Sequence, residues 1–242
     1  MGRFASREGT HLAFRGVAAR SLNYPHSPWP PAETARTAPV MTTAALLLSG
    51  GESSRFGGFP KALLSTGDET IVHRLARRCL ERGFAPVVVV AGAHHGPVAH
   101  AVRDLGVPVV MAENWREGRT ASMQAGLLAI PPECDLVFWP IDHPFVADRT
   151  VDRLLAARTA DPLAVWFLPE HEGRGGHPVL WRSGVRGDLL ALRPDAPIRS
   201  LIPEFGPQVR RVVVDDPGVL ENVDTPDEFR AALDAWHARG GD

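Results

Sequence analysis

Residues 46–61 read Leu46-Leu47-Leu48-Ser49-Gly50-Gly51-Glu52-Ser53-Ser54-Arg55-Phe56-Gly57-Gly58-Phe59-Pro60-Lys61, an apolar run followed by a glycine-rich loop and a lysine. The apolar run predicts a buried strand. The glycines allow the backbone to adopt positive φ angles and to approach a ligand without an intervening side chain. Exposed backbone N–H groups, together with Arg55 and Lys61, suit a polyanion such as a nucleoside triphosphate.

The loop differs from the two common phosphate-binding motifs. The Walker A pattern requires Gly-Lys-Ser or Gly-Lys-Thr, but Lys61 lies between Pro60 and Ala62. The Rossmann pattern requires G-x-G-x-x-G, which this spacing of glycine pairs does not supply. On the loop alone, a plain strand-to-helix turn with two incidental cations therefore remains an alternative.

The composition predicts one α/β domain. The chain has 242 residues, of which 44% are hydrophobic, so it is long and apolar enough to bury a sizeable core. Its net charge of −2 argues against non-specific binding to nucleic acid or to an anionic membrane surface. No apolar run reaches the length of a membrane span. We therefore expect a cytoplasmic protein without nucleic-acid or membrane partners.

Lysine and cysteine are both rare in this chain. Lys61 is the one lysine among 26 basic residues, which singles it out within its loop. The cysteines are Cys79 and Cys134, too few for a disulfide framework or a zinc site. Both have apolar neighbours, and we expect them in the core.

Residues 1–42 differ from the rest of the chain. They carry scattered arginine, serine and proline without a sustained period, which predicts a disordered N-terminal tail. The composition partly matches an organelle transit peptide, and a translation start at Met41 is a further alternative. The apolar segment that a secretory signal requires is missing.

From Thr43 onward, apolar runs alternate with helical patterns, which predicts a doubly wound, mostly parallel α/β sheet in a single domain, residues 43–242. Strands are predicted at Ala44–Leu48, Val87–Ala91, Val107–Met111, Leu136–Trp139, Ala164–Leu168 and Val209–Val214. Helices are predicted at Ile71–Arg82, Ser122–Ile130, Thr150–Arg158 and, after a capping box with proline at the first helical position, from Thr225. Ligands of such sheets bind outside the carboxyl ends of the strands.

Asp142 follows one of these predicted strands, Leu136–Trp139. A carboxylate at a strand end is suited to Mg²⁺, which prefers oxygen ligands and keeps several waters. The alternative is an aspartate that caps the next segment of the chain. His143 and Pro144 follow, and we treat His143 as a bystander, with contact to the substrate as the alternative.

Asn222 and Asp224 face the same side of an extended segment before the last helix, so both are candidates to contact a triphosphate or a second metal. Asp224 is also suited to the helix start, where a carboxylate is electrostatically favoured. Gly118-Arg119-Thr120-Ala121-Ser122 precedes another helix, where N–H groups and hydroxyls are suited to an anion or a nucleoside. Ser122 is equally suited to a purely capping role.

The sequence resembles the MobA-like nucleotidyltransferases in several blocks. That family opens with a strand, a Leu-x-Gly-Gly or Leu-x-Ala-Gly turn, an Arg-Met-Gly or Arg-Phe-Gly element and a lysine. The matching blocks follow the family's order from Thr43 to about Trp236: Leu48-Ser49-Gly50-Gly51, Arg55-Phe56-Gly57, Lys61, Gly118-Arg119-Thr120-Ala121-Ser122-Met123, Asp142-His143-Pro144-Phe145, Gly176-His177-Pro178-Val179-Leu180 and Asn222-Val223-Asp224-Thr225-Pro226-Asp227.

The resemblance implies a Rossmann-like nucleotidyltransferase (GT-A-like) fold and a set of site residues. The implied catalytic residues are Lys61, Arg55 and Asp142. The implied nucleotide-binding residues are Leu48, Ser49, Gly50, Gly51, Ser54, Arg55, Lys61, Gly118, Arg119 and Ser122. Asp142 and Asp224 are the implied ligands of Mg²⁺. Residues implied to bind the acceptor are His177, Asp195, Arg199 and Asn222, and the match is weakest in this group.

One block departs from the family. The cytidylyl branch usually has Gly-Asp-x-Gly-Ala-Arg where this chain has Arg193-Pro194-Asp195-Ala196-Pro197-Ile198-Arg199. Asp195 and Arg199 keep their spacing, whereas the glycines and the alanine are lost. This loop is implied to meet the second substrate.

The implied reaction is transfer of a nucleotidyl group from a nucleoside triphosphate to a phosphate on an acceptor of the molybdopterin type, with release of pyrophosphate. Gly50-Gly51 resembles the guanylyl branch, whereas the Gly118 and Gly176 blocks resemble the cytidylyl branch, which favours CTP. A molybdenum enzyme that receives the product is a further candidate partner. The alternatives are a guanylyltransferase, a sugar-phosphate nucleotidyltransferase, a nucleotide-sugar glycosyltransferase and a non-catalytic chaperone that binds the cofactor.

Overall fold

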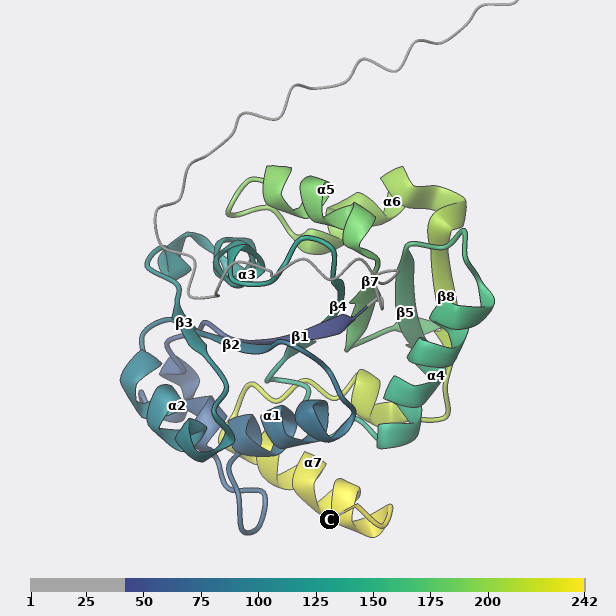
Figure 1. Cartoon of the computed structure of the whole chain (residues 1–242). Helices are drawn as coiled ribbons and strands as arrows, with labels where there is room; N and C mark the ends of the chain where they lie inside the picture. The colour runs from purple at the N-terminus through teal and green to yellow at the C-terminus, as the bar shows by residue number, and fades with distance from the viewer. Residues whose placement is uncertain (1–41, 242) are drawn as a thin grey trace, which may run out of the picture. The chain divides into compact units, whose positions relative to one another are not determined.

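The computed structural model describes residues 42–241, which form an α/β domain with helices on both faces of a central sheet (Figure 1). No helix among these residues is long and apolar enough to cross a membrane. The tail predicted over residues 1–42 lies, apart from Thr42, outside the described residues.

The sheet is mixed, with most neighbouring strands parallel. Its strands are β1 (Thr43–Ser49), β2 (Val87–Ala91), β3 (Val109–Met111), β4 (Asp135–Pro140), β5 (Trp166–His171), β6 (Arg174–Gly175), β7 (Val179–Trp181) and β8 (Val209–Val213). Their order is β3-β2-β1-β4-β7-β5-β6, and β8 also pairs with β5. β7 is antiparallel to β4 and β5, and β6 is antiparallel to β5, whereas the other pairs are parallel. The predicted mostly parallel sheet is therefore confirmed.

The sequence analysis predicts neither β6 nor β7. These strands have 2 and 3 residues, too few to show a hydrophobic period. The strand expected at Ala164–Leu168 begins later, at Trp166, and continues to His171.

The helices form two layers. They are α1 (Ile71–Glu81), α2 (His95–Ala101), α3 (Arg119–Leu128), α4 (Asp148–Ala160), α5 (Arg186–Ala191), α6 (Ile202–Phe205) and α7 (Pro226–Ala238). Figure 1 shows α1, α2, α4 and α7 on one face of the sheet and α3, α5 and α6 on the other. The predicted cap of the last helix is confirmed, because the Thr225 side chain accepts a hydrogen bond from the Glu228 amide. The helix expected from Ser122 begins earlier, at Arg119, so Ser122 lies inside the helix and does not cap it.

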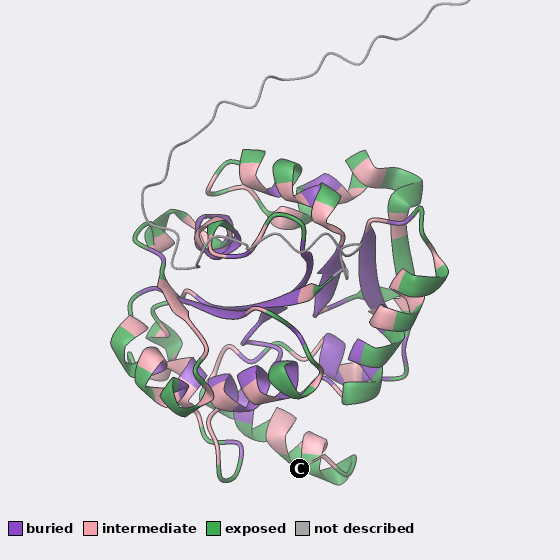
Figure 2. Cartoon of the chain, in the orientation of Figure 1, coloured by how far each residue is buried: buried purple, intermediate pink, exposed green. Residues whose placement is uncertain are grey.

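A separate apolar cluster lies on each face of the sheet, and the central strands β1, β2, β4 and β7 between them are almost entirely buried (Figure 2). Cys79 belongs to the cluster under α1, and Cys134 to the cluster under α3. Both cysteines are free and buried, as predicted. Burial raises the pKa of the Cys79 thiol to about 12, so this thiol stays protonated at neutral pH.

The register of β1 determines where the loops leave the sheet. Leu48 pairs with Pro140 on β4, and the Ile141 amide donates to the Leu48 carbonyl at 3.1 Å. Because β1 and β4 are parallel, their carboxyl ends lie at the same edge of the sheet. The glycine-rich loop and the Asp142 segment therefore leave the sheet side by side.

On α1, His73 links two acidic residues from different segments. Its ring nitrogens lie 2.8 Å from Glu69 and 3.0 Å from Asp104. Burial alone would lower the pKa of His73, but the hydrogen bonds to Asp104 and Glu69 and the charges of these carboxylates raise it. The stabilisation from this link is fully present below the unfolded pKa of about 6.5 and is lost as pH rises through the higher folded pKa.

We expect His73→Gln to lower the free energy of unfolding at pH 6 by about 1 kcal/mol or less, because these groups are partly exposed to solvent. The difference from the wild type should shrink at pH 9. Urea unfolding at the two pH values measures it, with His100→Gln on the exposed surface of α2 as the control. A difference of the same size at both pH values would contradict the proposed charge on His73.

Candidate active site

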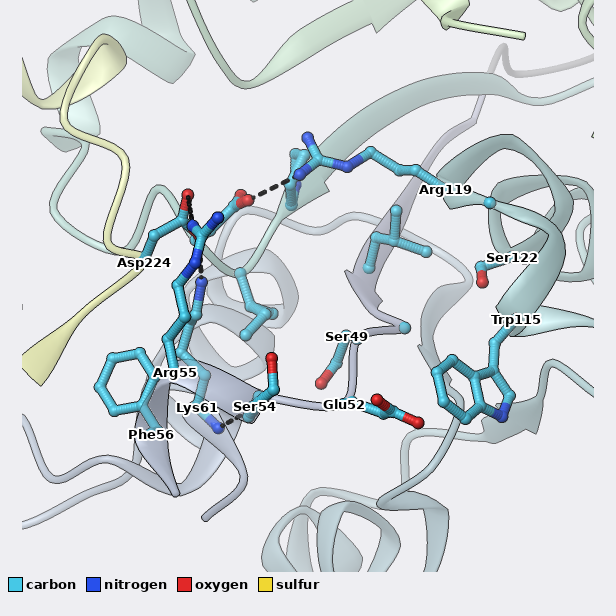
Figure 3. Close-up of a pocket in the computed structure, with 18 of the residues that line it drawn as sticks. Ser49, Glu52, Ser54, Arg55, Phe56, Lys61, Trp115, Arg119, Ser122 and Asp224 are labelled. Carbon is cyan, nitrogen blue, oxygen red and sulfur yellow. Dashed lines mark hydrogen bonds and ion pairs between the residues drawn. The ribbon is translucent and has the colours of Figure 1, made fainter. Parts of the chain in front are cut away.

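A cavity of about 670 Å³ opens at the carboxyl ends of β1 and β4. All the residues implied by the family resemblance to bind the nucleotide or the metal, or to act in catalysis, line it: Leu48, Ser49, Gly50, Gly51, Ser54, Arg55, Lys61, Gly118, Arg119, Ser122, Asp142 and Asp224. Figure 3 shows Arg55, Lys61 and Asp224 at one end of this cavity, and Trp115 and Ser122 at the other. The cavity therefore has a charged end and an end with an aromatic wall.

The glycine-rich loop is held in a compact shape by its own hydrogen bonds. Ser53, Gly57 and Gly58 have φ angles of 53°, 62° and 84°, in the left-handed region that favours glycine. The Ser53 hydroxyl accepts a hydrogen bond from the Lys61 amide at 3.0 Å. This contact fixes the backbone from which the Lys61 side chain extends into the cavity.

Lys61 and Arg55 both lie against Asp224. The Lys61 ammonium donates to Asp224 Oδ1 at 2.8 Å, and the Arg55 guanidinium lies 3.4 Å from Oδ2. Asn222 donates to the same carboxylate at 2.7 Å. Burial alone would raise the pKa of Asp224, but the bonds from Lys61 and Asn222 and the charges of Lys61 and Arg55 lower it. Asp224 is therefore ionised at neutral pH and holds both cations in place.

Asp142 is buried, and only one of its two carboxylate oxygens accepts a hydrogen bond. Its Oδ2 accepts a hydrogen bond from Arg119 at 3.0 Å, whereas its buried Oδ1 accepts none. The Asp142 carbonyl accepts from the Val223 amide at 2.8 Å, which joins the Asp142 segment to the segment that carries Asp224. A buried carboxylate oxygen without a donor is costly unless a cation or water satisfies it.

The donor set at Asp142 and Asp224 fits Mg²⁺. Residues 42–241 contain no group of three or more histidine, cysteine or acidic side chains that could hold a metal ion. Mg²⁺ is commonly held by one or two carboxylates, with water and phosphate oxygens as its other ligands. The unsatisfied Oδ1 of Asp142 is therefore the strongest sign of a cation here.

The sequence analysis missed Trp115, which forms the wall at the other end of the cavity. Its indole packs against Gly92, where a Cβ atom would lie 2.6 Å from Trp115 Cγ. Nearby, a Cβ atom at Gly50 would lie 2.7 Å from Ser122 Oγ. No sequence pattern connects these residues, because they come from separate loops and helices that meet only in the folded chain.

A second cavity, of about 640 Å³, lies beyond Arg119, which lines both cavities. Three of the residues predicted to bind the acceptor line it, namely His177, Asp195 and Arg199. Asn222 lines neither cavity and instead contacts Asp224. The second cavity has an apolar aromatic wall, formed by Phe138, Trp166 and Trp181.

Two histidines face each other in the second cavity. The rings of His143 and His177 are 4.8 Å apart, and the Nδ1 atom of each is buried without a partner. Burial lowers the pKa of His143, and the charges of Arg119 and Lys61 add to this effect, against those of Asp142 and Asp224. Burial also holds the pKa of His177 well below its usual value, with further contributions from His143 and Arg119. Both imidazoles are neutral at pH 7, and His143, which the sequence analysis treats as a bystander, lines this cavity.

The loop that departs from the family pattern packs on the start of α3. A Cβ atom at Gly118, whose φ is 148°, would lie 2.6 Å from the Pro194 carbonyl oxygen. The Ala121 amide and the Thr120 hydroxyl donate to the carbonyls of Pro194 and Ala196. This loop therefore lies between the start of α3, which lines the first cavity, and the second cavity.

Comparison with known proteins identifies close similarity to nucleotidyltransferases. Residues 45–209 match the family model of the MobA-like NTP transferase domain. The chain is 27% identical to nicotine blue oxidoreductase of Paenarthrobacter nicotinovorans over 193 residues, which covers 78% of this chain and 95% of that protein. It is 33% identical to molybdenum cofactor guanylyltransferase of Rhodopseudomonas palustris over 155 residues, which covers 60% of this chain and 68% of the relative.

Solved structures agree with these sequence matches. The Mycobacterium tuberculosis protein Rv0371c superposes with a TM-score of 0.70 at 27% identity and covers 80% of this chain and 98% of its own. Another structure of Rv0371c, a complex with manganese, has a TM-score of 0.66 at 25% identity, with the same coverage of both chains.

We expect Asp142→Asn to weaken the binding of a divalent ion without lowering the melting temperature of the metal-free protein. Asparagine keeps the size of the side chain but removes the charge that the cation requires. Calorimetric titration of Mn²⁺ in the presence of inorganic tripolyphosphate should show affinity weakened at least about tenfold. Asp227→Asn, at the exposed start of α7, is the control. Unchanged Mn²⁺ affinity in Asp142→Asn would remove this residue from the metal site.

Proposed function

The chain belongs to the family of MobA-like NTP transferase domains, and we propose that it transfers a nucleoside monophosphate from a nucleoside triphosphate to a phosphate-bearing acceptor of the molybdopterin type. An acceptor phosphate oxygen forms a bond to the α-phosphorus, and the bond from that phosphorus to the β-phosphate bridging oxygen breaks, so that pyrophosphate leaves. The acceptor phosphate is already anionic, so no protein nucleophile is required. The catalytic requirement is to hold both substrates and to offset the moving charge.

The observation that carries this proposal is the charged end of the first cavity. The one lysine of the chain lies there, 14% exposed and paired with Asp224 at 2.8 Å. A triphosphate that enters the cavity offers new acceptors to Lys61 and to the more exposed Arg55. Lys61 then offsets charge on the transferred group, and the loop from Gly50 to Gly58 supplies backbone N–H groups to the phosphates.

Asp142 and Asp224 would hold Mg²⁺. When bound, the ion would orient the α-phosphate and offset its charge. The ion would take the unsatisfied Oδ1 of Asp142, while Oδ2 keeps its hydrogen bond from the Arg119 side chain, which is 55% exposed. The manganese complex of Rv0371c supports a divalent ion in a related protein.

The second cavity is the proposed acceptor site. Its aromatic wall and the neutral pair His143 and His177 suit a planar, heteroatom-rich ring, and Arg199 suits an acceptor phosphate. The name of the Rhodopseudomonas palustris relative, molybdenum cofactor guanylyltransferase, supports an acceptor of the molybdopterin type. The same proposal includes a cytoplasmic location, a domain boundary at Thr43 and a molybdenum enzyme that receives the product.

The preferred base is proposed to be cytosine, with guanine as the second candidate. The Gly118 and Gly176 blocks favour CTP, whereas Gly50 and the guanylyltransferase relatives favour GTP. Gly50, which favours GTP, lies directly against Ser122 of the Gly118 block, which favours CTP. The two opposing signals therefore meet in one contact. A methyl group at position 50 would force the Ser122 hydroxyl to rotate.

Lys61→Ala should reduce turnover by about 10²–10³-fold, because the variant loses a charge that stabilises the transition state. Pyrophosphate release measures turnover, and thermal melting reports whether the fold is intact. Arg230→Ala, an exposed arginine of α7, is the control. Turnover close to that of the wild type would place Lys61 outside the reaction. Absence of pyrophosphate release in the wild type itself would favour a glycosyltransferase or a carrier.

The nucleotide is identified by pyrophosphate release with CTP, GTP and ATP in the presence of a molybdopterin-type acceptor. We expect CTP to be preferred, and Gly50→Ala to change the ratio of kcat/KM for CTP and GTP because it displaces the Ser122 hydroxyl. A preference for GTP in the wild type would favour a guanylyltransferase. Pyrophosphate release only with a sugar phosphate would overturn the proposed acceptor.

A further inference from the structure

A third cavity, of about 320 Å³, lies among α1, α4 and α7, on the face of the sheet away from α3. It shares no lining residue with the two cavities of the proposed active site. Five arginines and three acidic residues line it, which leaves an excess of positive charge. The proposed reaction does not use any of these groups.

Arg74 is the central feature of this cavity. Its side chain is 4% exposed, and its guanidinium stacks over the Trp236 ring at 4.6 Å. Its hydrogen bond to the Pro144 carbonyl is long, 3.4 Å, and no carboxylate among residues 42–241 lies within ion-pair distance of it. Burial and the charges of Arg78 and Arg77 lower the pKa of Arg74 to about 10, against the charges of Glu69 and Asp148, so it remains charged at neutral pH. A buried charge without a counter-ion in direct contact is costly, which favours an anion beside it.

Arg78 adds a second group without a partner. It is 5% exposed and donates to Asp148 and to the Val146 carbonyl through Nε and Nη2. Its remaining nitrogen, Nη1, is buried and has no hydrogen-bond partner. Two adjacent buried guanidinium groups therefore keep N–H donors available in the same cavity.

The start of α4 lines the cavity as well. This helix has 13 residues, and its N-cap is Ala147, which makes no side-chain capping bond. Alanine cannot supply the oxygen that serine, threonine or aspartate offers to the first amides of a helix. The partial positive charge of this end of the helix points to the same ligand chemistry as the arginines.

The acidic residues that line the cavity already have ion-pair or hydrogen-bond partners. Glu81 pairs with Arg77, and Asp148 pairs with Arg78 and Arg82. Asp216 accepts from the Ala147 amide and the Thr150 hydroxyl through Oδ2, and from the Gly218 amide through Oδ1. None of them has an ion pair with Arg74, so they do not neutralise it directly.

We propose that this cavity binds a phosphate-type oxyanion, which accepts hydrogen bonds from Arg74, from Arg78 Nη1 and from the first amides of α4. The planar fork of arginine matches two oxygens of a phosphate, and the stacked Trp236 ring fixes the orientation of that fork. The volume accommodates free phosphate or a phosphate group carried by a small molecule. This site is separate from the proposed active site and does not depend on the proposed reaction.

The test measures phosphate binding in a protein whose active-site cations are removed. In the double variant Arg55→Ala/Lys61→Ala, calorimetry and thermal melting follow titration with inorganic phosphate at constant ionic strength. We expect saturable binding and a rise in melting temperature that persist in this background. Loss of the whole effect there would show that phosphate binds only at the active site and would overturn the proposal.

Adding Arg74→Met to the same background should weaken phosphate binding at least about tenfold, because charge-assisted hydrogen bonds are lost. Arg230→Met, an exposed arginine on α7, is the matched control and should leave binding unchanged. Unchanged affinity in the Arg74→Met variant would overturn the proposal. If Arg74→Met does not fold, Arg74→Lys replaces it, because lysine keeps the charge but lacks the planar fork that binds two phosphate oxygens. Weaker binding of phosphate by Arg74→Lys is then expected, and unchanged affinity would overturn the proposal.

Parallel titrations with pyrophosphate and with glycerol phosphate identify the source of the anion. Tighter binding of glycerol phosphate indicates that the site takes a phosphate carried by a small molecule. Equal or tighter binding of free phosphate indicates an inorganic ligand. Absence of binding by all three anions in the double variant would overturn the proposal.

Discussion

The parallel pairing of β1 with β4 is the constraint on which the site depends. Leu48 lies opposite Pro140, so the glycine-rich loop and the Asp142 segment start from neighbouring strand ends. The last helix then approaches the same edge, because the Val223 amide donates to the Asp142 carbonyl. Three segments that are far apart in the sequence thus place Lys61, Asp142 and Asp224 around one cavity. A shift of one residue in the register of β4 would turn its side chains to the opposite face and separate them.

Each principal cation of this cavity is paired with a carboxylate of the same cavity. Lys61 and Arg55 lie on Asp224, and Arg119 lies on Asp142. In the proposed function, binding of a metal ion and a triphosphate would therefore be an exchange of partners, in which acidic groups turn to the cation and basic groups turn to the phosphates. Such pairing keeps the charged side chains in defined positions, and it avoids a buried charge that would destabilise the ligand-free fold.

The sequence predicts the parts of this protein that depend on local patterns. The apolar run of β1, the glycines after it and the cap at Thr225 are recognisable because neighbouring residues define them. The predicted metal and nucleotide residues lie in one cavity, which the order of strands and helices already suggests. By contrast, β7 is too short to show a period, and Trp115 reaches the cavity only because Gly92, on another segment, leaves it space. Contacts of this kind arise from the folded arrangement and leave no local trace in the sequence.

In the sheet, β7 lies between the strands that carry the first cavity and the later strands that carry the second. This division bears on how the substrate range of such a domain can evolve. The first cavity, proposed for the nucleotide, is built from β1, β4 and the segments next to them, whereas most walls of the second cavity come from residues 166–220, which include β5, β7 and the loop before α6. Substitutions in that later segment can reshape the second cavity while the first keeps its geometry. Under the proposed function, a lineage of such proteins would thereby be able to acquire a new acceptor without rebuilding the half of the domain that binds the energy-rich substrate.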